Sequence, residues 1–203
     1  MKQTVVTLDL EGVLVPEIWI AVAGHTGIEA LCRTTRDEPD YDVLMRQRLG
    51  ILDENNLKLS DIQAVIGGLE PLPGAKSFLD ELRASTQVII LSDTFLQFAA
   101  PLMRQLGWPT LFCNHLEIED DRIVNYHLRQ PDQKRQSVLA LRTLNYNIIA
   151  AGDSYNDTSM LAEADCGILF RAPDNVKEEF PQFPAVEEYR DLMELILERK
   201  GEK

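Results

Sequence analysis

Three short apolar segments of the sequence each end in an aspartate. They are VVTLD, QVIILSD and NIIAAGD, which end at Asp9, Asp93 and Asp153. Two further segments, at 110–113 and 166–170, have a similar apolar character. Short, nearly continuous apolar runs are typical of strands buried on both faces of a parallel sheet, and amphipathic helical stretches separate them here. The pattern predicts an α/β fold with a doubly wound parallel sheet.

The strand-end aspartates predict a functional site at one edge of this sheet. Right-handed crossovers place the carboxyl ends of parallel strands at the same edge, where open α/β sheets bind their ligands. An aspartate after a strand can also simply form a turn or cap a helix, and for any single one of the three this reading is equally good. Together, Asp9 and Asp153 favour a metal site.

A long segment without strand character separates the first two predicted strands. Residues 15–74 show mainly helical periodicity, with helices expected near 17–33, 41–54 and 60–69 and with Ser60 as an N-cap. Such a segment is too long for a simple crossover. We therefore predict a catalytic core of residues 1–14 and 75–203, interrupted by a small helical cap domain at 15–74.

The second half of the chain predicts two smaller features. The segment LEIEDDRIVNYHLR alternates in polarity around a turn-like centre, which is typical of a β-hairpin. We interpret this hairpin as surface decoration. Near the C-terminus, the spacing of Leu192, Leu195 and Ile196 predicts an amphipathic helix that docks on the core.

The net charge of the chain limits the classes of ligand that it is expected to bind. The net charge is −13 and the pI is about 4.6, which opposes binding to nucleic acid or to an anionic membrane. An anionic substrate would then need a bound cation and a few placed basic residues. Small-molecule partners are expected, and a homo-oligomer is compatible with the sequence.

The N-terminus and the cysteines bear on location. The N-terminus lacks a long apolar stretch, so a cytoplasmic location is expected. Cys32, Cys113 and Cys166 show no metal-binding spacing, and we expect them to be free, mostly buried thiols.

Four elements in the sequence can carry chemistry. Asp9 and Glu11 lie one residue apart after the first predicted strand, Ser92 lies in LSDT, Lys134 begins a predicted helix, and the last element is GDSYND at 152–157. Each alone is weak, because acids form turns, serines cap helices and most lysines are solvated. Their combination and order are the informative observation.

In that order the elements resemble the phosphohydrolase pattern of the haloacid dehalogenase-like superfamily, with DxD or DxE, then Ser or Thr, then Lys, then GDxxxD. The resemblance implies a Rossmann-like core. Glu17, the MRQR run that contains Arg46 and Arg48, the PLPGA segment and GDSYNDTSML extend the resemblance, over essentially the whole chain, to the phosphoserine phosphatase branch. Glu11 and the SDTF segment depart from ordinary members and resemble the bifunctional group that also transfers phosphate to homoserine.

The resemblance implies a role for each matched residue. Asp9 would be the nucleophile that forms an aspartyl phosphate, Glu11 the general acid and base, and Lys134 a catalytic cation. The implied Mg²⁺ ligands are Asp9, Glu11 through its backbone carbonyl, Asp153 and Asp157. The implied substrate and phosphate ligands are Glu17, Arg48, Ser92, Asp93, Thr94, Lys134 and Asn156.

The sequence leaves other functions open. A phosphatase for another small phosphomonoester would need the same core residues with a different cap. A receiver-like signalling domain also phosphorylates a strand-end aspartate on a doubly wound sheet, although Glu11 and the large insert count against it. A scaffold with a relic site is the third alternative, and the presence of all the site residues counts against it.

Overall fold

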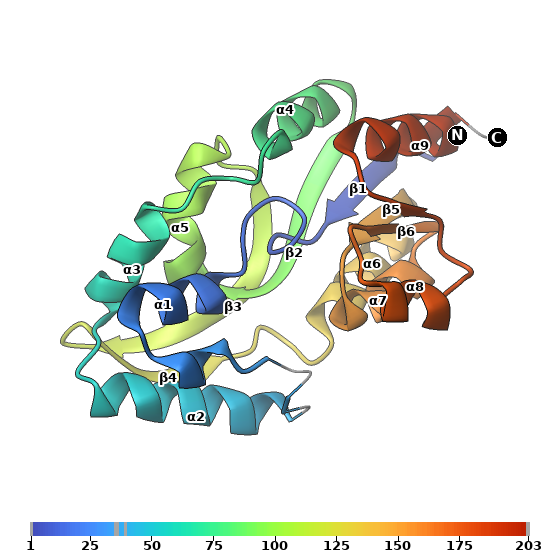
Figure 1. The fold of residues 1–203 in the computed structure, drawn as a ribbon. Helices are drawn as coiled ribbons and strands as arrows, with labels where there is room; N and C mark the ends of the chain where they lie inside the picture. Colours follow the sequence, from blue (N-terminus) through green and yellow to red (C-terminus); the bar gives the residue numbers. More distant parts are fainter. Residues whose placement is uncertain (1, 35–36, 39, 202–203) are drawn as a thin grey trace.

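The predicted strands lie side by side in one sheet. The computed structural model describes residues 2–34, 37–38 and 40–201. Within them, seven strands take the order β4-β3-β2-β1-β5-β6-β7, and only β4 is antiparallel to its neighbour. The strands are β1 (Thr4–Leu8), β2 (Gln87–Phe95), β3 (Thr110–Glu119), β4 (Arg122–His127), β5 (Asn147–Gly152), β6 (Cys166–Phe170) and β7 (Ala185–Val186). The predicted α/β fold is confirmed (Figure 1).

Strand β1 lies at the centre of the sheet. Its last residue, Leu8, is paired with Ile90 of β2 and Ala151 of β5, and all three are fully buried. This register brings the carboxyl ends of three strands together, so the chain segments that follow them meet at one edge. Strand β2 continues beyond the predicted end at Asp93 as far as Phe95, with an irregularity in its pairing to β3.

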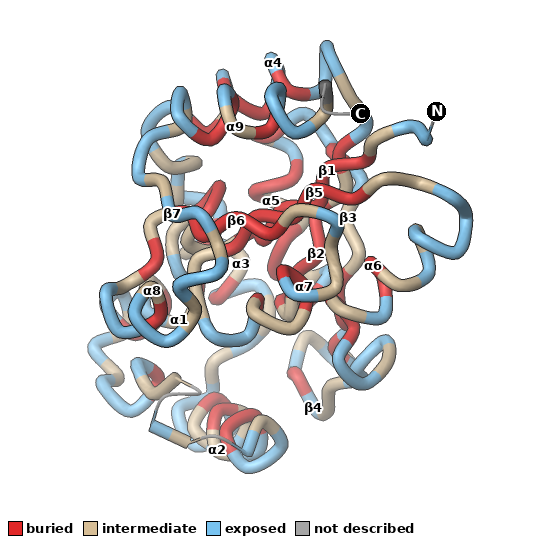
Figure 2. The backbone as a smooth tube through the Cα atoms, turned by 90° about the vertical axis from the view of Figure 1, so that its right-hand side faces the viewer, coloured by how far each residue is buried: buried red, intermediate tan, exposed pale blue. Residues whose placement is uncertain are grey.

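Helices cover both faces of the sheet. One face packs against α4 (Ala75–Ser85), α5 (Leu96–Gln105) and α9 (Tyr189–Gly201). The other packs against α6 (Gln133–Thr143), α7 (Thr158–Glu163) and α8 (Asp174–Glu179). Leu192 and Ile196 are fully buried and Leu195 is partly buried, so the terminal helix docks on the core as predicted. Figure 2 shows the buried residues concentrated in the strands, with α4 and α9 on one side of them.

The segment that we predicted to form a cap is helical. It contains α1 (Ile18–Thr26), a short 3-10 helix (Glu29–Cys32), α2 (Tyr41–Glu54) and α3 (Leu59–Gly67). The helix expected near 17–33 is interrupted at Gly27, whose φ of 72° ends α1. The expected cap at Ser60 is wrong, because α3 begins at Leu59 and the Asp61 carboxylate accepts a hydrogen bond from the Lys58 amide instead.

The β3–β4 hairpin is present and holds the helices α2 and α3. The Leu59 amide donates to the carbonyl of Asp121 at the hairpin turn over 2.8 Å. The Tyr126 hydroxyl of β4 donates to Asp42 of α2 over 2.6 Å. The hairpin therefore fixes the helical segment to the sheet, and our interpretation of it as decoration was too narrow. Figure 1 shows α2 beside β4.

The three cysteines differ in how far they are exposed. Cys113 is buried, Cys166 is partly buried and Cys32 is exposed, so the expectation of mostly buried thiols is wrong for Cys32. Across the described residues, none of the helices is both long enough and apolar enough to cross a membrane.

Candidate active site

Asp9 directly follows β1 and is almost completely buried. Its Oδ1 atom accepts a hydrogen bond from the Leu10 amide over 2.7 Å, which fixes the carboxylate at the strand end. The chain then turns at Gly12, where φ is +75°. A Cβ atom on Gly12 would overlap the Asp153 carboxylate. Glycine at this position therefore allows the loops after β1 and β5 to approach each other.

The loop after β5 is organised around Asp157, which is fully buried. Its Oδ2 atom accepts hydrogen bonds from the amides of Asp153 and Ser154, over 3.0 and 3.1 Å. Asp157 ends a short 3-10 helix (Tyr155–Asp157). A Cβ atom on Gly152 would overlap the Asp157 carboxylate, so the small residue is needed for this packing.

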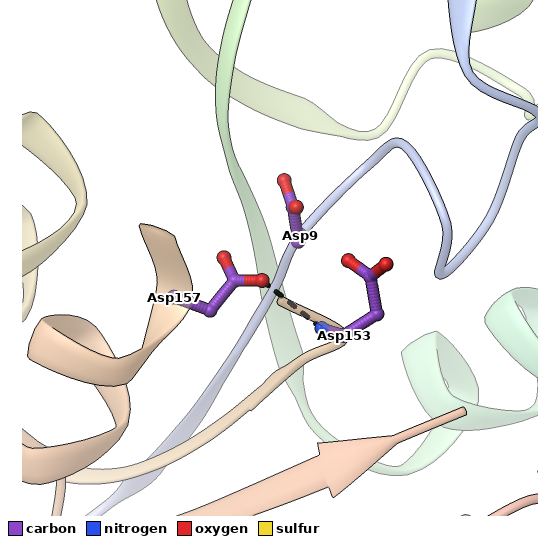
Figure 3. A group of neighbouring side chains, drawn as sticks. All are labelled: Asp9, Asp153 and Asp157. Carbon is purple, nitrogen blue, oxygen red and sulfur yellow. Dashed lines mark hydrogen bonds between the residues drawn. The ribbon is translucent and has the colours of Figure 1, made fainter. Parts of the chain in front are cut away.

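Three carboxylates converge between these loops. One oxygen each of Asp9, Asp153 and Asp157 lies within 4.8 Å of the others (Figure 3). Burial, followed by the charge of Asp157, raises the pKa of Asp9 well above its usual value and that of Asp153 to about 7. Carboxylate oxygens in this arrangement fit a hard divalent cation such as Mg²⁺, which would relieve their mutual repulsion.

Lys134 is the positive group inside this cluster. Its Nζ atom lies 2.7 Å from Asp157 Oδ1, 3.0 Å from Asp9 Oδ1 and 3.7 Å from Asp93 Oδ2. Burial by itself would lower the pKa of Lys134, but the carboxylates of Asp157 and Asp9 outweigh it and hold the pKa well above its usual value. The first turn of α6 thus supplies a permanent cation beside Asp9.

Glu11 has the environment of a group that exchanges protons near neutral pH. Its Oε2 atom accepts a hydrogen bond from the Ile18 amide over 2.9 Å. Burial, followed by the charge of Glu17, raises the pKa of Glu11 to about 7. A carboxyl group with this pKa can donate a proton in one step and accept one in the next.

A cavity of about 330 Å³ opens above Asp9. Among the described residues its walls carry five acidic side chains and two basic ones. The acids are Asp9, Glu11, Glu17, Asp93 and Asp153, and the bases are Arg48 and Lys134. This excess of acidic over basic groups would oppose an anionic ligand unless a cation were bound, which agrees with the metal site inferred from the three carboxylates.

Arg48 lines the cavity and is only 7% exposed. Its Nη2 atom donates to the Arg33 carbonyl over 2.7 Å, and its guanidinium carbon lies 4.6 Å from the ring centroid of Trp19. Its buried Nε has no hydrogen-bond partner among the described residues. Burial lowers the pKa of Arg48 to about 10. Because orphaned buried donors are costly, this one indicates a ligand.

Known proteins identify the family of this chain. A family model for haloacid dehalogenase-like hydrolases matches residues 4–165. The chain belongs to the haloacid dehalogenase-like hydrolases. It is 69% identical over 186 residues to phosphoserine phosphatase ThrH of Pseudomonas aeruginosa, covering 91% of each chain. It is also 69% identical to a phosphoserine phosphatase of Pseudomonas syringae, covering 91% of this chain and 78% of that protein.

Solved structures agree in fold. A phosphoserine phosphatase in its apo form has a TM-score of 0.77 at 21% identity, covering 95% of this chain and 98% of that one. A phospho-aspartyl intermediate analogue of phosphoserine phosphatase has a TM-score of 0.79 at 20% identity, covering 96% and 99%. At such identities the likeness concerns the fold alone.

In this haloacid dehalogenase-like hydrolase the predicted site residues come together. All of them except Asp157 line the cavity, and these are Asp9, Glu11, Glu17, Arg48, Ser92, Asp93, Thr94, Lys134, Asp153 and Asn156. Asp157 is fully buried and accepts a hydrogen bond from Lys134. Sequence reasoning missed Trp19 and Tyr41. Their signal in the sequence was weak, because both are large aromatic residues in the predicted cap helices, and such residues more often pack in a hydrophobic core.

Proposed function

We propose that this chain is a Mg²⁺-dependent phosphoserine phosphatase that works through an aspartyl phosphate at Asp9 and also transfers the phosphoryl group to homoserine. The observation that carries the proposal is that buried Arg48, whose Nε is unpartnered, lines the same cavity as Asp9. A ligand that carries both a phosphate and an amino-acid carboxylate would place the phosphate near Asp9 and the carboxylate near Arg48. The names of the two most similar relatives reported above support the same substrate.

The phosphate end would be held by the sheet edge. Ser92, the amides that follow it, and Asn156 would bind the phosphoryl oxygens, with Lys134 neutralising the charge that spreads over them in the transition state. The Ser92 hydroxyl is already oriented, because it accepts a hydrogen bond from the Thr94 amide over 3.2 Å. Thr94 lines the same cavity.

The metal would be held by Asp9, Asp153 and the backbone carbonyl of Glu11, with Asp157 beside them. When bound, Mg²⁺ supplies positive charge between the anionic nucleophile and the anionic phosphate. Asp157 already accepts two backbone amides and the Lys134 ammonium group, so its main task would be to orient its neighbours.

The first half-reaction would phosphorylate Asp9. A carboxylate oxygen of Asp9 attacks phosphorus, a new P–O bond forms, and the bond from phosphorus to the serine oxygen breaks. Glu11, with a pKa of about 7, gives its proton to the departing oxygen. Serine is released and Glu11 is left as a carboxylate.

The second half-reaction would return Asp9 to its starting state. The oxygen of the incoming hydroxyl group attacks phosphorus, and the bond from phosphorus to Asp9 breaks. Glu11 takes the proton of that hydroxyl group. With water the product is inorganic phosphate, and with homoserine it is phosphohomoserine. Arg48 would bind the carboxylate and Glu17 the ammonium group of either amino acid, a complementary arrangement of charges.

Turnover measurements test this proposal. Purified protein is incubated with Mg²⁺ and phosphoserine, with and without homoserine, while free phosphate and phosphohomoserine are followed. Repeated turnover with both products is expected. A single phosphorylation without turnover would favour the receiver-like alternative, and preference for a phosphomonoester without an amino-acid group would favour a different small-molecule phosphatase.

A further inference from the structure

A second cavity, of about 530 Å³, adjoins the one above Asp9. Five residues line both cavities and so form the boundary between them: Tyr41, Asp93, Lys134, Tyr155 and Asn156. The remaining walls of the second cavity include Asn114, Leu128, Gln130 and Gln133. The boundary therefore lies beside the phosphate end of the proposed active site.

Asp93 is the most heavily bonded residue of this boundary. Its Oδ1 atom accepts from the Gln133 side chain over 3.0 Å, and its Oδ2 atom accepts from the Asn156 side chain over 3.2 Å. Its backbone carbonyl accepts from the Asn114 side chain over 3.0 Å and from the Tyr41 hydroxyl over 3.4 Å. The residue thus connects β2 to α6, to β3, to the loop after β5 and to the cap helix α2.

The partners of Asp93 are themselves fixed. Gln133 is buried and also donates to the Ser92 carbonyl over 2.6 Å. Asn156 accepts a hydrogen bond from the Ser154 hydroxyl through its Oδ1 atom. Each amide is therefore held at two points, and Asp93 joins them. The Gln133 end of this boundary is buried and the Asn156 end is exposed, so the network orders the boundary most firmly on the side of α6.

The charge of Asp93 argues against direct binding of phosphate by its side chain. The carboxylate would repel the phosphoryl oxygens, and it lies only 3.7 Å from the Lys134 ammonium group that these oxygens need. A role for Asp93 in phosphate binding would then fall to its backbone amide. The side chain must therefore serve another purpose, and its bonds across the boundary indicate which.

We propose that Asp93 is a positioning residue that keeps the two cavities separate and so favours phosphoryl transfer over hydrolysis. This inference rests on the proposed function. Between the two half-reactions, the bond from phosphorus to Asp9 must survive while serine leaves and homoserine enters. Water that reached phosphorus would form a P–O bond, release Asp9 and give its proton to Glu11. The bridge from Gln133 through Asp93 to Asn156 lies along the boundary with the second cavity and would hinder the approach of water from that side.

The test measures how each variant divides the phosphoenzyme between water and homoserine. Asp93→Ala removes both side-chain bonds, and Gln133→Ala loosens Asp93 without changing a residue of the first cavity. Gln130→Ala is the matched control, because Gln130 lines the second cavity away from the boundary. The ratio of phosphohomoserine to phosphate is measured at fixed homoserine, and the decay of labelled phosphoenzyme is followed without acceptor.

In Asp93→Ala the ratio is expected to fall about tenfold, the factor carried by one hydrogen bond to a charged group, and the phosphoenzyme is expected to decay faster by the same factor. Gln133→Ala should shift both quantities in the same direction and Gln130→Ala neither. A purely structural defect would lower kcat without moving the ratio. If the wild type turns over normally and the ratio is unchanged in Asp93→Ala and Gln133→Ala, the role of Asp93 in partition is overturned but the proposed function is not. A wild type that forms no phosphoenzyme would overturn the proposed function as well.

Discussion

The ammonium group of Lys134 lies 3.0 Å from a carboxylate oxygen of Asp9, and both side chains are at least nine-tenths buried. On its other side the same nitrogen lies 2.7 Å from Asp157. This contact couples the proposed nucleophile to the stability of the fold, because the positive charge offsets the desolvation of two buried carboxylates.

Replacing Lys134 by Met should therefore affect both activity and stability. Two buried carboxylates would lose their cation, which costs about 3 kcal/mol when one member of a buried ion pair is removed. Turnover should fall about a thousandfold because the phosphoryl oxygens lose their counter-charge. Urea unfolding and steady-state kinetics measure the two effects. Lys76→Met is the control, since Lys76 pairs with Asp80 on the surface; equal losses in both variants would contradict the assignment.

Asp9→Asn should remove phosphoenzyme and turnover together while the fold persists. The amide has the same shape as the carboxylate but is a far weaker nucleophile. Labelled phosphoserine followed by acid quenching measures the covalent intermediate, and circular dichroism confirms the fold. Substantial phosphatase activity in the variant would show that another group attacks phosphorus.

The sequence predicts well which strand-end residues meet at one edge of the sheet, because its signals there are local. Asp9 and Asp153 each follow a short apolar strand, and the topology of a parallel sheet is sufficient to bring them together. Lys134 is predicted only in combination with them. Nothing in its own neighbourhood distinguishes it from a solvated lysine.

Contacts that cross between distant segments were beyond sequence reasoning. The stacking of Arg48 on Trp19 depends on how α1 and α2 pack, and the bond between Leu59 and Asp121 depends on where the hairpin turn lies relative to α3. The periodicity of apolar residues along the sequence does not show how separate segments contact each other. The bonds of Asp93 are a further case, because they join five separate segments.

Mg²⁺ should stabilise the protein against heat through the three converging carboxylates. A ligand that binds only the folded state adds about 2.7 kcal/mol at roughly a hundred times its Kd. The thermal midpoint should rise with Mg²⁺ and return to its starting value with a chelator. In Asp153→Asn the rise should largely vanish, while Asp80→Asn, on the surface, should keep it. An equal rise in all three proteins would place the metal elsewhere.

Thiol reactivity should separate the cysteines and depend on pH. Burial raises the pKa of Cys113 from its ordinary value of 9.0 to about 11, so its thiolate is scarce at pH 8. Exposed Cys32 should react first with a thiol reagent. Because the pKa of Cys113 is raised in the folded state, its contribution to the free energy of unfolding is complete below pH 9 and is lost as the pH rises toward 11. Cys113→Val should flatten the loss of stability in this range, and an unchanged profile would contradict the shift.

Arg48→Ala should separate recognition of the amino acid from phosphoryl chemistry. Loss of a charged hydrogen bond to the substrate carboxylate should raise KM for phosphoserine about thirtyfold, with a change of less than about twofold for an aryl phosphate that lacks this group. Arg46→Ala is the matched control on the same helix, since Arg46 is exposed and pairs with Asp42. Because Trp19 supports the guanidinium group, Trp19→Leu should raise KM for phosphoserine in the same direction by a smaller factor. Equal effects of Arg48→Ala on both substrates would place Arg48 outside the amino-acid end of the cavity.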